Sequence, residues 1–164
     1  MAGPALELER DYEFGPAIVW DALVDADLLS GWLGEATVTP EIGGEYTVRF
    51  IHRPDQARAM GEVTDLVFRS RLRAQTTAGA WEFTLTAHPG GNRGTRTRLR
   101  VAVWLPAGAP ATAALTAAIT ADWMTNLDQL YELLHGHPVD WATWHRDWSD
   151  DWAGHLADYQ HSTG

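Results

Sequence analysis

GAWEFTLTAHPGGNRGTRTRLRVAVWL, residues 79–105, is the stretch that decides the fold class. Apolar and polar residues alternate with a period of two on both sides of the turn sequence Pro89–Asn92. This alternation is typical of antiparallel strands that have one buried and one solvated face, and the proline and glycines between them favour a turn. The stretch therefore predicts a pair of long antiparallel strands.

The same alternation predicts more strands nearer the N-terminus. They are expected at residues 6–14, 46–52, 61–68 and 72–76. After the first strand, Pro16 suits the first turn of a short helix that ends near Asp25. A second short helix is expected to begin there and to end at Gly34.

A long helix is predicted after the strands, from about Ala111 to His135. Its apolar stripe, at spacings of three and four, consists of Leu115, Ile119, Trp123, Leu127, Leu130 and Leu134. Its first two turns are rich in alanine and threonine, so they leave room between the helix and the sheet. The order of elements predicts an α+β fold in which about six to seven antiparallel strands curve around this helix.

The composition excludes several classes of function. With 164 residues and no cysteine, the chain has no disulfide scaffold, thiolate zinc site or cysteine nucleophile. A formal net charge of −10 disfavours nucleic acid as a partner. No apolar run reaches the roughly 18 residues of a membrane span, and no signal peptide is visible at the start. We therefore expect a cytoplasmic protein.

Five short motifs resemble those of one superfamily in their order and spacing. They are Val19–Asp25, Trp32–Gly34, Ile42–Tyr46, Gly61–Val63, and Asp122–Trp123 with leucines at 127, 130 and 134. Together they resemble the START and birch-pollen-allergen helix-grip superfamily, and within it the branch named after the activator of the heat-shock-90 ATPase. The resemblance covers about residues 6–135 and implies a helix-grip domain at residues 1–137. Residues 138–164 are expected to form a separate helical extension.

The resemblance also implies a hydrophobic cavity between sheet and helix that holds lipids, polyketides or other apolar small molecules. Its expected lining is Trp32, Tyr46, Val48, Phe50, Trp81, Phe83, Leu99, Val101, Ile119 and Trp123. Apolar walls with few polar groups are typical of small-molecule sites. The alternative is that these side chains simply fill a core.

A small-molecule binding protein is therefore the main hypothesis, and two alternatives stay open. Some members of the superfamily resemble cyclases, dehydratases or hydrolases, and the acid–base candidates here are His52, Tyr46 and Asp65. The second alternative is a protein-interaction module that resembles the co-chaperone domain of the branch. No cofactor is expected.

No metal site is predicted either. His135 and His137 flank Gly136 at the end of the long helix, where the helix dipole favours histidine. Asp151 and His155 stand four residues apart on an expected helix, but the sequence fixes no third ligand beside them.

The C-terminal extension is acidic and rich in tryptophan. Trp141, Trp144, Trp148 and Trp152 are three and four residues apart, which places them on one side of a helix. Four exposed indoles would make a larger apolar patch than monomeric proteins normally show. According to one hypothesis, this helix docks on the outer face of the sheet, either in the same chain or in a homodimer partner, through guanidinium–indole contacts. The arginines of that face are Arg71, Arg73, Arg96, Arg98 and Arg100. The alternative is that the helix extends the core at the mouth of the cavity.

Overall fold

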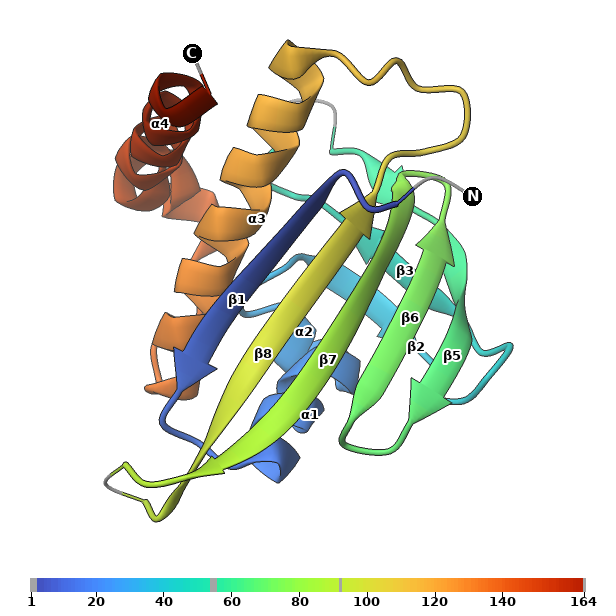
Figure 1. Ribbon diagram of the computed structural model, residues 1–164, viewed down its shortest axis with the longest axis vertical. Coiled ribbons are helices and arrows are strands. Elements are labelled where there is room, and N and C mark those ends of the chain that lie inside the picture. The colour runs from blue at the N-terminus through green and yellow to red at the C-terminus, as the bar shows by residue number, and fades with distance from the viewer. Residues whose placement is uncertain (1–2, 54–55, 92, 164) are drawn as a thin grey trace.

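A five-stranded antiparallel sheet forms one face of the structure, a computed structural model that describes residues 3–53, 56–91 and 93–163 (Figure 1). In spatial order its strands are β1 (Leu6–Tyr12), β8 (Thr95–Trp104), β7 (Gly79–Pro89), β6 (Arg71–Thr76) and β5 (Gly61–Val67). The predicted hairpin is β7 and β8, which pair from Ala80 opposite Trp104 to Pro89 opposite Thr95. Asn92 of the predicted turn lies outside the described residues.

A second, three-stranded sheet is an addition to the prediction. It consists of β2 (Glu35–Val38), β3 (Tyr46–Arg49) and β4 (Arg58–Ala59). A β-bridge between Glu45 and Glu62 connects it to the large sheet. The strand predicted at residues 46–52 ends at Arg49, so His52 lies in the loop that follows. With four and two residues, β2 and β4 are too short for a period of two to stand out.

The helices confirm the α+β class. The helices α1 (Pro16–Val24) and α2 (Ala26–Leu29) follow β1, and α3 (Ala113–Leu134) is the predicted long helix. The hydroxyl of Thr112 accepts a 3.1 Å hydrogen bond from the backbone N–H of Leu115, which fixes where α3 begins. α3 contacts β1 and α1, and the hydrophobic core lies between these helices and the sheets.

The C-terminal extension folds back along α3. It contains a 3-10 turn, η1 (Trp141–Thr143), and the helix α4 (Trp144–Thr163), which packs beside α3 on the side away from β1 (Figure 1). Gly31 lets the extension approach, because a Cβ atom there would lie 2.7 Å from Leu133 Cδ1 and 3.1 Å from Pro138 Cβ. The backbone N–H of Val139 then donates a 2.9 Å hydrogen bond to the Gly31 carbonyl.

None of the helices in the described ranges is both long enough and apolar enough to cross a membrane.

Candidate functional site

Nine of the ten residues expected to line a cavity lie in the packed core, and none of the nine is more than 4% exposed. Their rings fill the space between sheet and helix. The ring centroids of Trp81 and Trp123 are 5.5 Å apart, those of Tyr46 and Trp81 6.1 Å, and those of Trp32 and Phe83 6.3 Å. Only Ile119, on α3, lines an open pocket.

The three acid–base candidates lie in three different places. Tyr46 is fully buried, its hydroxyl donates a 2.9 Å hydrogen bond to the Leu23 carbonyl, and burial raises its pKa. Asp65 is half-exposed on β5 and pairs with Arg71 at 2.6 Å. Of the three candidates, the pocket wall includes His52 and neither of the others.

The pocket has a volume of about 840 Å³ and lies between the N-terminal half of α3, the first half of α4 and the loop after β3. Its apolar wall consists of Ala78, Pro106, Leu115, Ala118, Ile119, Trp144 and Trp152. Its polar wall consists of His52, Arg53, Asp122, His145 and Ser149. The α3 part is the alanine-rich end of the helix, where small side chains leave space beside the core.

Two residues of the polar wall, Arg53 and Asp122, form an ion pair. The Arg53 Nη2 atom lies 3.0 Å from Asp122 Oδ2, and the guanidinium carbon lies 4.0 Å from the centroid of the Phe50 ring. The Trp152 indole N–H donates a 2.8 Å hydrogen bond to Asp122 Oδ1. Burial raises the pKa of Asp122, while Arg53 and the indole oppose that rise.

His52 is sandwiched against the extension. Its ring stacks on Trp141, with centroids 5.5 Å apart and an interplanar angle of 21°, and lies 4.7 Å from the Trp144 ring. Burial lowers the pKa of His52 to about 4, and the nearby charges of Arg53 and His145 act in the same direction. His52 is therefore neutral near pH 7, and the permanent cation of this wall is Arg53.

The extension is held in place by a buried amide. Gln129 on α3 accepts a 2.7 Å hydrogen bond from the Trp144 indole and donates one of 2.7 Å to the Trp32 carbonyl. The Trp141 indole donates to the Ser30 carbonyl at 2.6 Å. The extension therefore packs on α3 at the edge of the core, as the second hypothesis expected. Docking on the sheet arginines of the same chain is wrong.

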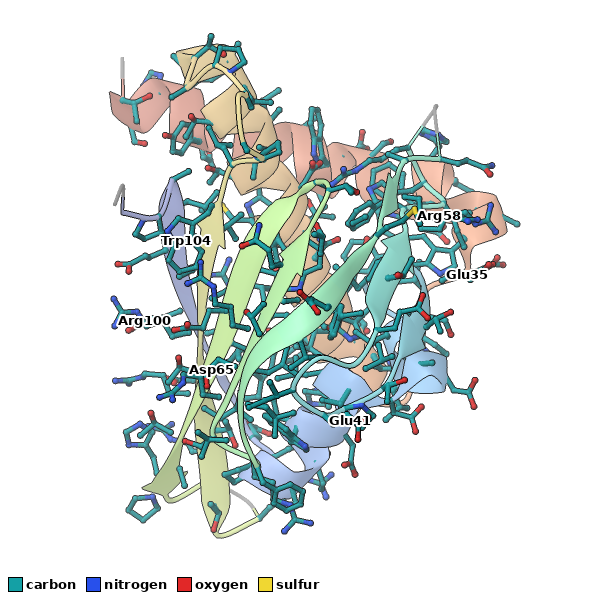
Figure 2. The ribbon with its side chains drawn as sticks, turned by 90° about the vertical axis from the view of Figure 1, so that its right-hand side faces the viewer. Glu35, Glu41, Arg58, Asp65, Arg100 and Trp104 are labelled. Carbon is teal, nitrogen blue, oxygen red and sulfur yellow. The ribbon has the colours of Figure 1, made fainter. Side chains whose placement is uncertain are left out.

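Among the described residues, four of those five arginines, all except Arg96, form ion pairs with acidic side chains on neighbouring strands. Besides Arg71 with Asp65, the cross-strand pairs are Arg98 with Asp11 at 3.0 Å, Arg100 with Glu7 at 2.9 Å, and Arg73 with Glu82 at 3.9 Å. The Arg73 guanidinium also lies 4.1 Å from the centroid of the Trp104 ring. Figure 2 shows Arg100 and Trp104 on the outer side of the large sheet, away from Glu35 and Arg58 on the opposite side. These pairs leave little unpaired charge for an acidic partner.

One cluster between α3 and α4 has residue types that hold metals. His155 Nε2 lies 2.6 Å from Asp128 Oδ2 and 3.4 Å from Asp151 Oδ2, and the three ligand atoms lie within 4.8 Å of one another. Burial and the nearby Asp128 raise the pKa of Asp151 to about 6. Sequence spacing pointed to Asp151 and His155, but it could not find Asp128, which comes from another helix.

Comparisons with known proteins place most of the chain in one family. The family model described as activator of Hsp90 ATPase homolog 1-like protein matches residues 13–135, well over half of the chain. A search of the curated proteins found no match.

Three solved structures show the same fold at low sequence identity. MLL2253 from Mesorhizobium loti is 19% identical with a TM-score of 0.64, over 82% of this chain and 98% of that one. CalU16 from Micromonospora echinospora is 16% identical with a TM-score of 0.65, over 94% and 85%. EF2215 from Enterococcus faecalis is 18% identical with a TM-score of 0.63, over 94% and 84%. Coverage of 94% is more than residues 1–137 can supply, so part of the extension has a structural counterpart in the latter two.

Proposed function

Since this chain belongs to the family of activator of Hsp90 ATPase homolog 1-like proteins, we propose that it binds an apolar small molecule in the pocket between α3 and α4. The observation that carries the proposal is the pocket itself. Its volume of about 840 Å³ falls in the range of roughly 300–1,000 Å³ that is usual for small-molecule sites. Seven of its twelve lining residues are apolar and five are polar.

The proposed site differs from the expected one in its lining. Ile119 is common to both, and the other nine expected residues take a supporting role, because their packing holds α3 and the loop after β3 in place. The extension contributes Trp144 and Trp152 to the wall. We infer that α4 completes a binding site that the rest of the chain leaves open.

The two alternatives have less support. A cyclase or hydrolase would need acid–base groups that converge, whereas His52, Tyr46 and Asp65 lie apart. A co-chaperone-like module that uses the sheet arginines would have to break the cross-strand ion pairs of the outer face.

Native mass spectrometry of gently purified protein, before and after organic extraction, tests the proposal. We expect a bound mass that extraction removes and that decanol, added afterwards, replaces. Ala118→Phe, which fills the pocket, should abolish decanol binding, whereas Ala113→Phe, at an exposed position on the same helix, should not. Decanol binding that survives Ala118→Phe would contradict the proposed site.

The same spectra measure oligomeric state. A homodimer through Trp141, Trp144, Trp148 and Trp152 stays a prediction, as does a cytoplasmic location. In the single chain, Trp144 is buried and the indole N–H groups of Trp141, Trp144 and Trp152 already have acceptors. A dimer contact would therefore have to use Trp148 and the exposed parts of Trp141 and Trp152.

A further inference from the structure

On the polar wall of the pocket, some hydrogen-bonding groups have partners and others have none. Both carboxylate oxygens of Asp122 already accept a hydrogen bond, one from Trp152 and one from Arg53. By contrast, the Arg53 Nε atom is buried and has no partner among the described residues. The His52 Nδ1 atom on the same wall is buried and unpartnered too. The role of His52 Nδ1 depends on its tautomer, but the Arg53 Nε–H is always a donor, so the described part of the wall lacks an acceptor at Arg53.

The guanidinium of Arg53 is held ready for such an acceptor. The Phe50 ring lies against its face and Asp122 fixes one of its terminal nitrogens, so few side-chain torsions are left to order on binding. Water does not reach Nε, but 29% of the Arg53 side chain is exposed. Since Arg53 also lines the pocket, a ligand there can approach the guanidinium as it is held.

The charges on this wall favour an anionic acceptor. Arg53 is the permanent cation, and His52 is neutral near pH 7 because burial keeps its pKa at about 4. Burial also raises the pKa of Asp122, while Arg53 and the Trp152 indole oppose that rise. Hydrogen bonds from a guanidinium to a carboxylate are among the strong ones in proteins.

The apolar wall of the pocket suits an alkyl or aromatic body. Leu115, Ala118 and Ile119 contribute aliphatic carbon from α3, and Trp144 and Trp152 contribute their indoles from α4. A molecule with one polar end can therefore place its body against these side chains and its head at Arg53.

We infer that the ligand is an apolar monocarboxylic acid whose carboxylate is bound by Arg53. This inference rests on the proposed function, since it concerns the head group of a molecule in the same pocket.

Titration of the extracted protein with decanoate, decanol and decylamine, by calorimetry at neutral pH, tests it. We expect decanoate to bind roughly tenfold or more tightly than decanol, because a hydrogen bond to a charged group is worth about that factor. Arg53→Met should remove this preference and leave decanol binding unchanged. Arg58→Met, an exposed arginine on β4 outside the pocket wall, is the matched control.

Each other outcome has a definite meaning. Equal binding of all three probes, or a preference for decylamine, would overturn the carboxylate inference and leave the proposed function standing. Binding of none of them would overturn the proposed function itself. Because Arg53→Met leaves Asp122 without its cation, the double variant with Asp122→Asn keeps an acceptor for Trp152 and repeats the test in a neutral wall. A preference for decanoate that persists in both variants would contradict the role of Arg53.

Discussion

The indole N–H of Trp144 donates a 2.7 Å hydrogen bond to the side-chain oxygen of Gln129, and both residues are buried. The same amide donates to the carbonyl of Trp32. One side chain of α3 therefore connects the segment after α2 to the start of α4. Since α4 supplies part of the pocket wall, this amide ties the shape of the pocket to the core.

Gln129→Leu tests that connection. It leaves the Trp144 N–H and the Trp32 carbonyl without partners, and each buried unsatisfied group costs about 1–3 kcal/mol. We expect the free energy of unfolding to fall by roughly 2–4 kcal/mol, measured by urea denaturation. Gln160→Leu, at an exposed position on α4, should change it little. An equal effect of the two variants would show that the buried amide has no special role.

The fold could be predicted because its signal is periodic. Alternation over 79–105 identifies β7 and β8, and the apolar stripe of 111–135 identifies α3. The same periodicity identifies the buried face, and nine of the ten expected lining residues are indeed buried. It carries no information about whether the inward space is empty. Here the rings of Trp81 and Trp123 fill it, and the open space lies farther along α3.

The candidate site was harder to predict because its polar groups come from segments far apart in the chain. Arg53 follows β3, Asp122 lies on α3 and Trp152 on α4, and no spacing in the sequence relates them. Asp128 was missed beside Asp151 for the same reason. Only the alanine-rich start of α3 signalled that space would be left near the pocket.

Asp151 should make stability fall as pH rises through the acidic range. Its pKa is about 6 in the folded chain, against 3.8 for an ordinary aspartate, so the folded state binds its proton more tightly. The resulting penalty is absent below about 3.8 and complete above about 6. We expect Asp151→Asn to raise the melting temperature at neutral pH and to lose that advantage as the solution is acidified. Asp150→Asn, its exposed neighbour, is the control, and a lower melting temperature for Asp151→Asn at neutral pH would contradict the prediction.

His52 should have the opposite effect on the pH dependence of stability: it should make stability fall as the pH is lowered. Its pKa is about 4 in the folded chain and 6.5 ordinarily, so the unfolded chain takes up a proton first as the pH falls. Stability is therefore lost between about 6.5 and about 4. His52→Phe keeps a ring against Trp141 and Trp144 and should flatten the loss, whereas the exposed His161→Phe should not. Melting curves that fall equally for the natural chain and His52→Phe would show that His52 is not the group responsible.

The cluster of Asp128, Asp151 and His155 is expected to work without a metal ion. The 2.6 Å contact between His155 Nε2 and Asp128 uses two of the three ligand atoms in an interhelical hydrogen bond. Treatment with a strong chelator should therefore leave the melting temperature unchanged. A lower melting temperature that zinc restores, and that His155→Gln abolishes, would instead identify a metal centre.

Removal of residues 138–164 separates the domain from its extension. The family match ends at residue 135, so residues 1–137 should keep their secondary structure in circular dichroism. They would nevertheless lose the indole that Gln129 binds and the contacts that cover α3, which should lower stability and let an apolar dye bind the uncovered helix.

Decanol binding by the truncated chain should disappear, because Trp144 and Trp152 leave the pocket wall. The substitution Trp148→Ala, at a half-buried position on α4 outside that wall, should preserve decanol binding. A truncated chain that binds decanol as tightly as the full one would show that α4 only covers the core, and the site would then have to lie on the domain alone.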